Sequence, residues 1–370
     1  MNPFLVDKIV TPEDFCGRKE ELSELLSLIE SKANVMLYGD RRYGKTSLIK
    51  KAFSLIPKNV LPIYVDIYDA VDEMDFSRKL YIAVEEATPM TLRKEAGKLL
   101  DMLGRIKGVD FKPSQTGDGF SFKPSIVSKD FDQLLESAIH LIEQYCKHSG
   151  SSHAVIAFDE FQQVADMKGV KIDAKLRQIS QENSNVSFIF SGSKKSILRE
   201  LINAPKQPWH GMTTPISVKG IDVESLKNYC EKRLGGKFEM TAFESVYKAF
   251  RGQTRLILQT CFYLYARDIK NPLIVDIQKA IKDQVASYDD EFRDKFAMYS
   301  MRQKKAFKAV SKAEPGTLFS KETLEEQNII KQALNQAITS LEKLDEMQKI
   351  SEGVYQINNI MFDLWLKKMD

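Results

Sequence analysis

The feature that most constrains this 370-residue chain is a glycine-rich segment near its beginning. Gly39 and Gly44 are separated by four residues. Lys45 and Thr46 follow directly, which completes the pattern GxxxxGK(S/T). A short apolar run, Asn34–Tyr38, precedes the segment, and a helical pattern follows it. Because backbone N–H groups at such a strand-to-helix turn form a cradle for anions, the sequence predicts a phosphate-binding loop in an α/β fold.

The residues after the second glycine have distinct expected roles toward a nucleoside triphosphate. The ammonium group of Lys45 reaches the β- and γ-phosphates as a point charge, and the Thr46 hydroxyl is a ligand for Mg²⁺. Ser47 is expected at the α-phosphate. The complete predicted nucleotide-binding loop is Gly39, Asp40, Arg41, Arg42, Tyr43, Gly44, Lys45, Thr46 and Ser47.

A second acidic motif strengthens this prediction. The apolar run Ala154–Phe158 has the composition of a buried strand, and Asp159 and Glu160 follow it directly. Such a strand places both carboxylates at the carboxyl edge of a sheet, beside the phosphate loop. We expect Asp159 to hold the magnesium shell and Glu160 to orient and deprotonate the attacking water.

Alternating strand and helix patterns fill the first half of the chain. A parallel sheet with helices on both faces is the fold that such alternation predicts. Residues 107–127 interrupt it and are either a β-hairpin insertion or a mobile loop. The predicted strands are Asn34–Tyr38, Val60–Ile67, Ala154–Phe158 and Val186–Phe190.

Helical patterns dominate after Pro215. Helices are expected at Asp222–Leu234, Thr241–Arg251, Arg255–Ile269 and Val275–Tyr288, and Tyr288–Lys295 is either a linker or a bridging helix. From about Phe296 there are three helical patterns and a small hairpin that turns at Gly353. This is the outline of a winged helix, a variant of the helix-turn-helix.

The chain resembles the archaeal-type AAA+ ATPase family, which is related to the STAND signalling ATPases and to the replication-initiator ATPases. The resemblance is carried by Phe15-Cys16-Gly17-Arg18-Lys19-Glu20-Glu21-Leu22, the phosphate loop, Phe158-Asp159-Glu160, Phe190-Ser191-Gly192-Ser193, Gly252-Gln253-Thr254-Arg255, Tyr355-Gln356-Ile357 and Trp365-Leu366. It implies a P-loop AAA+ core over residues 1–215, with the hairpin insertion at about 107–127. A helical lid at 216–290 and a winged-helix domain at 291–370 complete the implied architecture.

The resemblance also implies roles for residues outside the two main motifs. Gly17 and Arg18 lie on the adenine and ribose side, and Ser191 or Ser193 is the sensor on the strand beside the phosphate. Arg255 opens a lid helix as the second sensor, which touches the γ-phosphate. The chain departs from the family at three places. Serine replaces the usual sensor Asn or Thr, Gly252-Gln253-Thr254 replaces Gly-x-Pro, and Trp209-His210-Gly211-Met212 lacks the usual arginine.

Two functions are expected from the two main motifs together with what the resemblance implies. The first is Mg²⁺-dependent ATP hydrolysis by a molecular switch, with Glu160, Lys45, Arg255 and Ser191 as the catalytic set and Thr46 and Asp159 at the metal. The alternative is a module that retains ADP, turns over little and recruits a protein or DNA. A small-molecule kinase is disfavoured because the chain has no obvious acceptor-site motif.

Several arginines and lysines keep two interpretations each. Arg41 and Arg42 either contact phosphate or a partner, or are solvated. Arg177 is either an arginine finger or an exposed helix residue. A basic run on the first helix of the predicted winged helix either meets DNA phosphates or is solvated, and residues 296–370 hold only 11 basic against 10 acidic residues. The run is Arg302, Lys304, Lys305, Lys308 and Lys312.

Composition limits the partners and the location. The 54 basic and 51 acidic residues give a net charge of +3, which does not by itself indicate nucleic acid and argues against a membrane surface. We therefore expect a protein partner first and DNA second, with oligomer formation open. The four cysteines are far apart in sequence, and no signal peptide or membrane-spanning run is present. These features predict a cytoplasmic protein.

Overall fold

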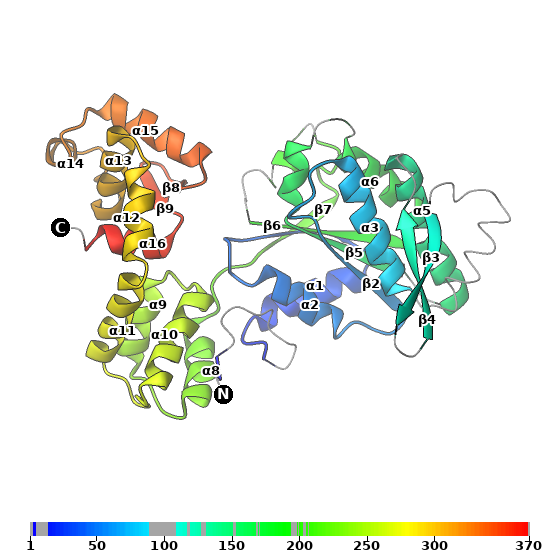
Figure 1. The fold of residues 1–370 in the computed structure, drawn as a ribbon, viewed down its shortest axis with the longest axis horizontal. Helices are drawn as coiled ribbons and strands as arrows, with labels where there is room; N and C mark the ends of the chain where they lie inside the picture. Colours follow the sequence, from blue (N-terminus) through cyan, green and yellow to red (C-terminus); the bar gives the residue numbers. More distant parts are fainter. Residues whose placement is uncertain are drawn as a thin grey trace. The chain divides into compact units, whose positions relative to one another are not determined.

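The computed structural model forms two compact units, Lys8–Asp222 and Val223–Asp370 together with Met1–Asp7 (Figure 1). The residues that the structure describes are 3–4, 14–88, 109–116, 119–126, 131–150, 153–167, 169, 171–193, 198, 200–202, 205 and 207–368, with the backbone alone in 109–116 and 119–126. Within these residues, no helix is both long and apolar enough to span a membrane.

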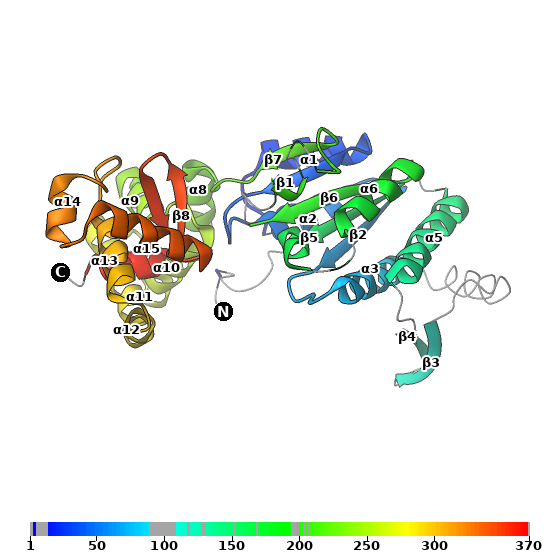
Figure 2. The ribbon, with the colours of Figure 1, turned by 90° about the horizontal axis from the view of Figure 1, so that it is seen from above.

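The core of the first unit is a five-stranded parallel sheet in the order β2-β5-β6-β1-β7 (Figure 2). Every residue of β5 and β6 is buried, as expected for central strands that have helices on both faces. Strand β6 separates β1 from β5, so the two predicted motifs flank it. The strands are β1 (Asn34–Tyr38), β2 (Val60–Asp66), β5 (His153–Asp159), β6 (Val186–Gly192) and β7 (Thr213–Ser217).

Strand β7 is absent from the sequence prediction. It is short, it contains Pro215, and it lies at the edge of the sheet, where a missing backbone N–H is tolerated. Its register with β1 pairs Met36 with Pro215 and Tyr38 with Ser217. The sheet thus continues past residue 215, the predicted end of the ATPase core. The first compact unit ends at Asp222.

Helices cover both faces of the sheet, as the sequence predicts (Figure 2). One face packs on α1 (Lys19–Glu30) and α2 (Lys45–Phe53) through Val155 and Ala157 of β5. The opposite face packs on a second set of helices through the alternate residues of β5, Ile156 and Phe158. This set is α3 (Glu73–Ala87), α5 (Phe131–Ser149) and α6 (Ile172–Glu182).

An aromatic cluster fixes the carboxyl end of β5. The ring of Phe158 stacks on Phe76 of α3 at 5.0 Å between centroids and on Phe190 of β6 at 6.4 Å. The 3₁₀ helix η1 (Phe161–Asp166) follows, and Phe161 packs on Phe190 at 4.5 Å. The backbone that carries Asp159 and Glu160 is therefore held by buried rings on both sides.

The segment that interrupts the alternation is a hairpin, which is one of its two predicted forms. Strand β3 (Val109–Thr116) pairs antiparallel with β4 (Gly119–Ile126), from Val109 opposite Ile126 to Thr116 opposite Gly119.

The second unit is helical up to a small terminal hairpin. Residues 288–295, predicted as a linker or a bridging helix, lie mainly in helix α12 (Asp289–Ala297), which packs through Phe292 on Phe362 and Trp365. The elements are α8 (Val223–Leu234), α9 (Met240–Ala249), α10 (Thr254–Ala266), α11 (Ile274–Ala286), α12 (Asp289–Ala297), α13 (Met301–Lys312), α14 (Lys321–Glu326), α15 (Lys331–Lys343), β8 (Met347–Ser351), β9 (Val354–Ile357) and α16 (Ile360–Leu366).

Arg251 ties the helical part of this unit to the terminal hairpin and helix. It lies in the turn between α9 and α10 with φ 52°. Its guanidinium donates to the carbonyl of Ile357 at 2.8 Å and forms an ion pair with Asp363. Asp363 is only 3 % exposed. Separating Arg251 from Asp363 would leave an uncompensated charge that is nearly buried, which is unfavourable. The ion pair therefore holds the turn before α10 firmly against the terminal hairpin and helix.

Candidate functional site

The predicted phosphate loop joins β1 to α2, as its motif requires. A Cβ on Gly39 would lie 2.1 Å from the backbone oxygen of Val218, so only glycine fits against the segment after β7. Gly44 has φ 82°, a left-handed conformation that glycine adopts without strain. Lys45, Thr46 and Ser47 then form the first turn of α2, whose positive end points its N–H groups at the loop.

Lys45 is buried under this loop. Lys45 is only 5 % exposed. Its ammonium donates to the carbonyl of Gly39 at 2.9 Å and to the carbonyl of Asp40 at 3.2 Å. Burial lowers its pKa, although the negative charges of Glu160 and Asp159 act in the opposite direction. A buried cation whose hydrogen bonds go to neutral carbonyls fits an additional anionic ligand such as a phosphate.

Asp159 is the centre of the hydrogen-bond network at the sheet edge. Its Oδ2 accepts from the hydroxyls of Thr46 at 2.5 Å and Tyr64 at 2.8 Å. Its Oδ1 accepts from the hydroxyl of Ser191 at 2.8 Å and from the backbone N–H of Glu160 at 3.1 Å. The carboxylate is thereby fixed, and burial together with Asp159 raises the pKa of Tyr64. The structure brings together the two residues predicted to hold magnesium.

The donor set suits Mg²⁺. Among the described residues, no group of three or more His, Cys, Asp or Glu side chains could hold a metal ion by itself. Magnesium beside a triphosphate needs less, because phosphate oxygens and waters supply most of its six ligands. One carboxylate and one hydroxyl, as in Asp159 and Thr46, fit such a site.

Glu160 follows in a strained backbone conformation with φ 57°. Its Oε2 accepts from the hydroxyl of Ser193 at 3.0 Å and from the side-chain amide of Gln162. The two candidate sensors therefore have different partners: Ser191 contacts Asp159, and Ser193 contacts Glu160.

Arg18 braces the loop from the segment before α1. It is 6 % exposed, and its guanidinium donates to the carbonyl of Tyr43 and pairs with Glu21 at 3.4 Å. Gly17 and Arg18 both have positive φ, 63° and 59°. The structure thus places Arg18 beside the phosphate loop, and Gly17 directly precedes Arg18 in the chain.

The other predicted arginines are more dispersed. Arg41 lies over the Tyr68 ring at 5.9 Å, and Arg42 has φ 68°. Arg177 is half-buried on α6. Arg255 lies in the first turn of α10, in the other compact unit.

Two residues of the site were not predicted from the sequence. Tyr64 alternates with core residues in β2, so its pattern is that of an ordinary strand, although its hydroxyl contacts Asp159. Gln162 lies two residues after Glu160, and its side-chain amide contacts that carboxylate. Its position close to the acidic motif is the one signal in the sequence that could have indicated this contact.

Comparisons with known proteins agree with this geometry. Residues 15–260 match a family described as the ATPase domain predominantly from Archaea. The Walker-type ATPase PABY2304 of Pyrococcus abyssi has a similar structure, with a TM-score of 0.65 and 17 % identity over 99 % of each chain. The ORC2 protein of Aeropyrum pernix, solved in ADPNP–ADP complexes, gives 0.53 and 13 % over 99 % of each chain. No curated protein matches the sequence.

The two kinds of similarity carry different weight. At these identities the solved structures show a shared fold. The family match covers more than half of the 370 residues and includes the phosphate loop, Asp159 and Glu160. The chain therefore belongs to the family of ATPase domains found predominantly in Archaea, and it is an ATPase.

Proposed function

We propose that this ATPase is a Mg²⁺-dependent, STAND-like molecular switch. The observation that carries the proposal is the contact of Thr46 with Asp159, which joins the residue after the buried Lys45 to the residue before Glu160. The two proposed ligands of Mg²⁺, the lysine that binds phosphate and the general base thus come together at one edge of the sheet.

Each side chain has a role that follows from its position. Lys45 and the loop N–H groups bind the triphosphate, and Arg18 holds the loop in shape. Thr46 and Asp159 would hold Mg²⁺, which neutralises phosphate charge when bound. Glu160 accepts the proton of the attacking water, and Ser191 keeps Asp159 oriented.

The switch would act through the second unit. We assign α8–α11 to the helical lid and the segment from α12 to α16, whose described residues form five helices and a hairpin, to a winged-helix domain. Arg255 would sense the γ-phosphate from the first turn of α10. The adjacent Arg251 is bonded to Ile357 and Asp363, so a shift at the start of α10 would reach the terminal domain.

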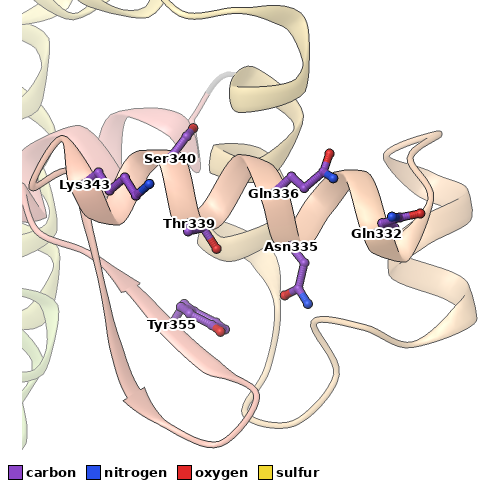
Figure 3. Close-up of a pocket in the computed structure, with 7 residues that line it drawn as sticks. All are labelled: Gln332, Asn335, Gln336, Thr339, Ser340, Lys343 and Tyr355. Carbon is purple, nitrogen blue, oxygen red and sulfur yellow. The ribbon is translucent and has the colours of Figure 1, made fainter.

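DNA is a candidate partner of that terminal domain. A polar groove of about 560 Å³ lies between α15 and the hairpin, and Lys343 is the only charged residue among the described residues that line it (Figure 3). Amide and hydroxyl side chains on an exposed helix suit hydrogen bonding to base edges. The lining residues are Gln332, Asn335, Gln336, Thr339, Ser340, Lys343 and Tyr355.

The basic run on α13 gives less support to DNA binding. Lys304 and Lys305 donate to the carbonyls of Ala297 and Asn328, and Lys312 pairs with Glu326 at 3.0 Å. These three lysines are engaged within their own domain, so a protein partner remains the alternative occupant.

A second candidate function is the ADP-retaining module. It is favoured by the contact of the Ser191 hydroxyl with Asp159, which directs that sensor away from a hydrolytic water. Nucleotide extracted from freshly purified protein separates the two functions. Stoichiometric ADP together with negligible phosphate release would support the module, whereas nucleotide-free protein that releases phosphate from Mg–ATP would support the switch.

The lowered pKa of Lys45 gives a pH prediction. In the nucleotide-free protein its ammonium is lost at a pH below the ordinary pKa of 10.5, so the affinity for ATP should already fall as the pH rises toward 10.5. Calorimetric titration with ATP measures this fall. The variant Lys45→Arg, which stays charged, should bind with an affinity that does not change over that range.

Folding stability should change in the opposite direction. Because the pKa is lower in the folded than in the unfolded state, the buried charge destabilises the fold at neutral pH. This penalty fades as the pH rises toward the unfolded pKa. Affinity and stability that fall in parallel would contradict the assignment of the effect to Lys45.

The proposed metal site predicts an altered magnesium requirement in Asp159→Asn. The hydroxyls of Thr46, Tyr64 and Ser191 can reverse their hydrogen bonds to suit an amide, so the fold should survive. The concentration of Mg²⁺ that gives half-maximal phosphate release should rise about 10- to 100-fold. Asp69→Asn, an exposed carboxylate paired with Lys79, is the control and should leave it unchanged.

A further inference from the structure

Three energetically unfavourable features meet at the side chain of Glu160. Its own backbone is left-handed, with φ 57°, a conformation that is unfavourable for a residue other than glycine. A glycine, Gly192, occupies the end of the buried strand β6, where it weakens the strand. The side-chain oxygen of Gln162 is buried without a hydrogen-bond partner among the described residues. Such departures persist where function requires them.

Gln162 connects the three features. It is 6 % exposed in η1, and its Nε2 donates to Oε2 of Glu160 and lies 3.5 Å from the hydroxyl of Ser193. Ser193 donates to the same Oε2 at 3.0 Å. The reversed amide would place an oxygen against a carboxylate, so the chemistry fixes the amide orientation.

The orphaned oxygen of Gln162 explains the glycine. A Cβ at position 192 would lie 2.3 Å from Oε1 of Gln162, whereas the next nearest atom, Cδ2 of Leu198, is 3.3 Å away. Gly192 therefore leaves the space that the amide occupies. The side-chain oxygen of Gln162 lacks a hydrogen bond and position 192 lacks a side chain. Both losses allow the Gln162 amide to donate to Glu160.

This arrangement holds one carboxylate oxygen and leaves the other for chemistry. Oε2 of Glu160 accepts both side-chain hydrogen bonds, and Oε1 has no hydrogen-bond partner among the residues described. We propose that Gln162 is a positioning residue for hydrolysis, which anchors Oε2 so that Oε1 receives the proton of the attacking water. The inference rests on the proposed role of Glu160 as the general base.

The first test replaces the amide by a side chain of similar size. In Gln162→Leu, kcat for ATP hydrolysis should fall about 10- to 100-fold, while the KM for ATP and the affinity for ADP stay within about twofold of the wild type. This split between kcat and KM is an effect that a purely structural role would not produce.

Gly192→Ala provides a second, independent route to the same effect. The new Cβ should displace the amide and lower kcat as much as Gln162→Leu does. In a Gln162→Ala background the obstructing oxygen is gone, so Gly192→Ala should then cost little. The two substitutions should therefore be strongly non-additive in a double-mutant cycle.

The outcomes separate this proposal from the proposed function. If Glu160→Gln abolishes turnover but Gln162→Leu and Gly192→Ala keep kcat within twofold of the wild type, Gln162 has no positioning role and the base stands. Additive effects of Gly192→Ala and Gln162→Ala would also overturn the inference. If Glu160→Gln itself keeps full activity, the proposed function fails first. Thermal unfolding of each variant identifies any loss that reflects misfolding.

Discussion

Glu160→Gln is expected to lower kcat for ATP hydrolysis by about 10²- to 10⁴-fold, the contribution typical of a general base. Glutamine has nearly the same shape, so the contacts with Ser193 and Gln162 can re-form with an amide. It cannot accept a proton from water at neutral pH. Because Lys45 and the loop are untouched, the affinity for ATP should stay close to that of the wild type.

Phosphate release at saturating ATP measures kcat, and calorimetry measures the affinity. Glu182→Gln is the matched control, because Glu182 is an exposed residue at the end of α6 whose partner is Gln178. It should leave both quantities unchanged. Equal turnover of Glu160→Gln and wild type would remove Glu160 from the chemistry. A large loss of ATP binding in Glu160→Gln would instead indicate a role in the shape of the site.

The local backbone of the site was predictable from the sequence. The spacing of Gly39, Gly44 and Lys45 fixes a strand–loop–helix unit, because each residue type has a backbone or charge role there. The buried strands were also predictable, because they are continuous apolar runs in the sequence. The observed bounds of β1 are the predicted ones. In contrast, β7 was missed because an edge strand with a proline has a weak local signal and gains its stability from pairing with β1.

Contacts between distant segments were not predictable in the same way. Tyr64 and Asp159 are 95 residues apart, and they meet because β2 pairs with β5 in register. Ser191 lies within β6 and Ser193 just beyond its end, and they contact different carboxylates, a difference that the motif alone does not resolve. The amide of Gln162 depends on the 3₁₀ turn after Glu160 and on the absence of a Cβ at Gly192. Tertiary packing, rather than residue type, decides these contacts.

Gly39→Ala is expected to weaken productive nucleotide binding strongly while the protein remains folded. The added Cβ would lie 2.1 Å from the backbone oxygen of Val218, and backbone cannot rotate away as a flexible side chain can. The N–H of Val218 also donates to Tyr38 at 2.7 Å, so the segments on both sides of the clash are tied. The start of the loop must therefore shift. Displacement of a binding group by about 1 Å costs on the order of 100-fold in kcat/KM.

Gly150→Ala separates this effect from a general loss of stability. Gly150 has φ 67° with nothing within 4 Å of its added Cβ, so alanine there is strained by about 1–2 kcal/mol without touching the site. Overpacking at Gly39 should destabilise by a similar amount, about 1–3 kcal/mol. The two variants should thus unfold at similar denaturant concentrations and differ in ATP affinity. Wild-type affinity in Gly39→Ala would mean that the loop tolerates the displacement, and that the close approach to Val218 is not what shapes the phosphate cradle.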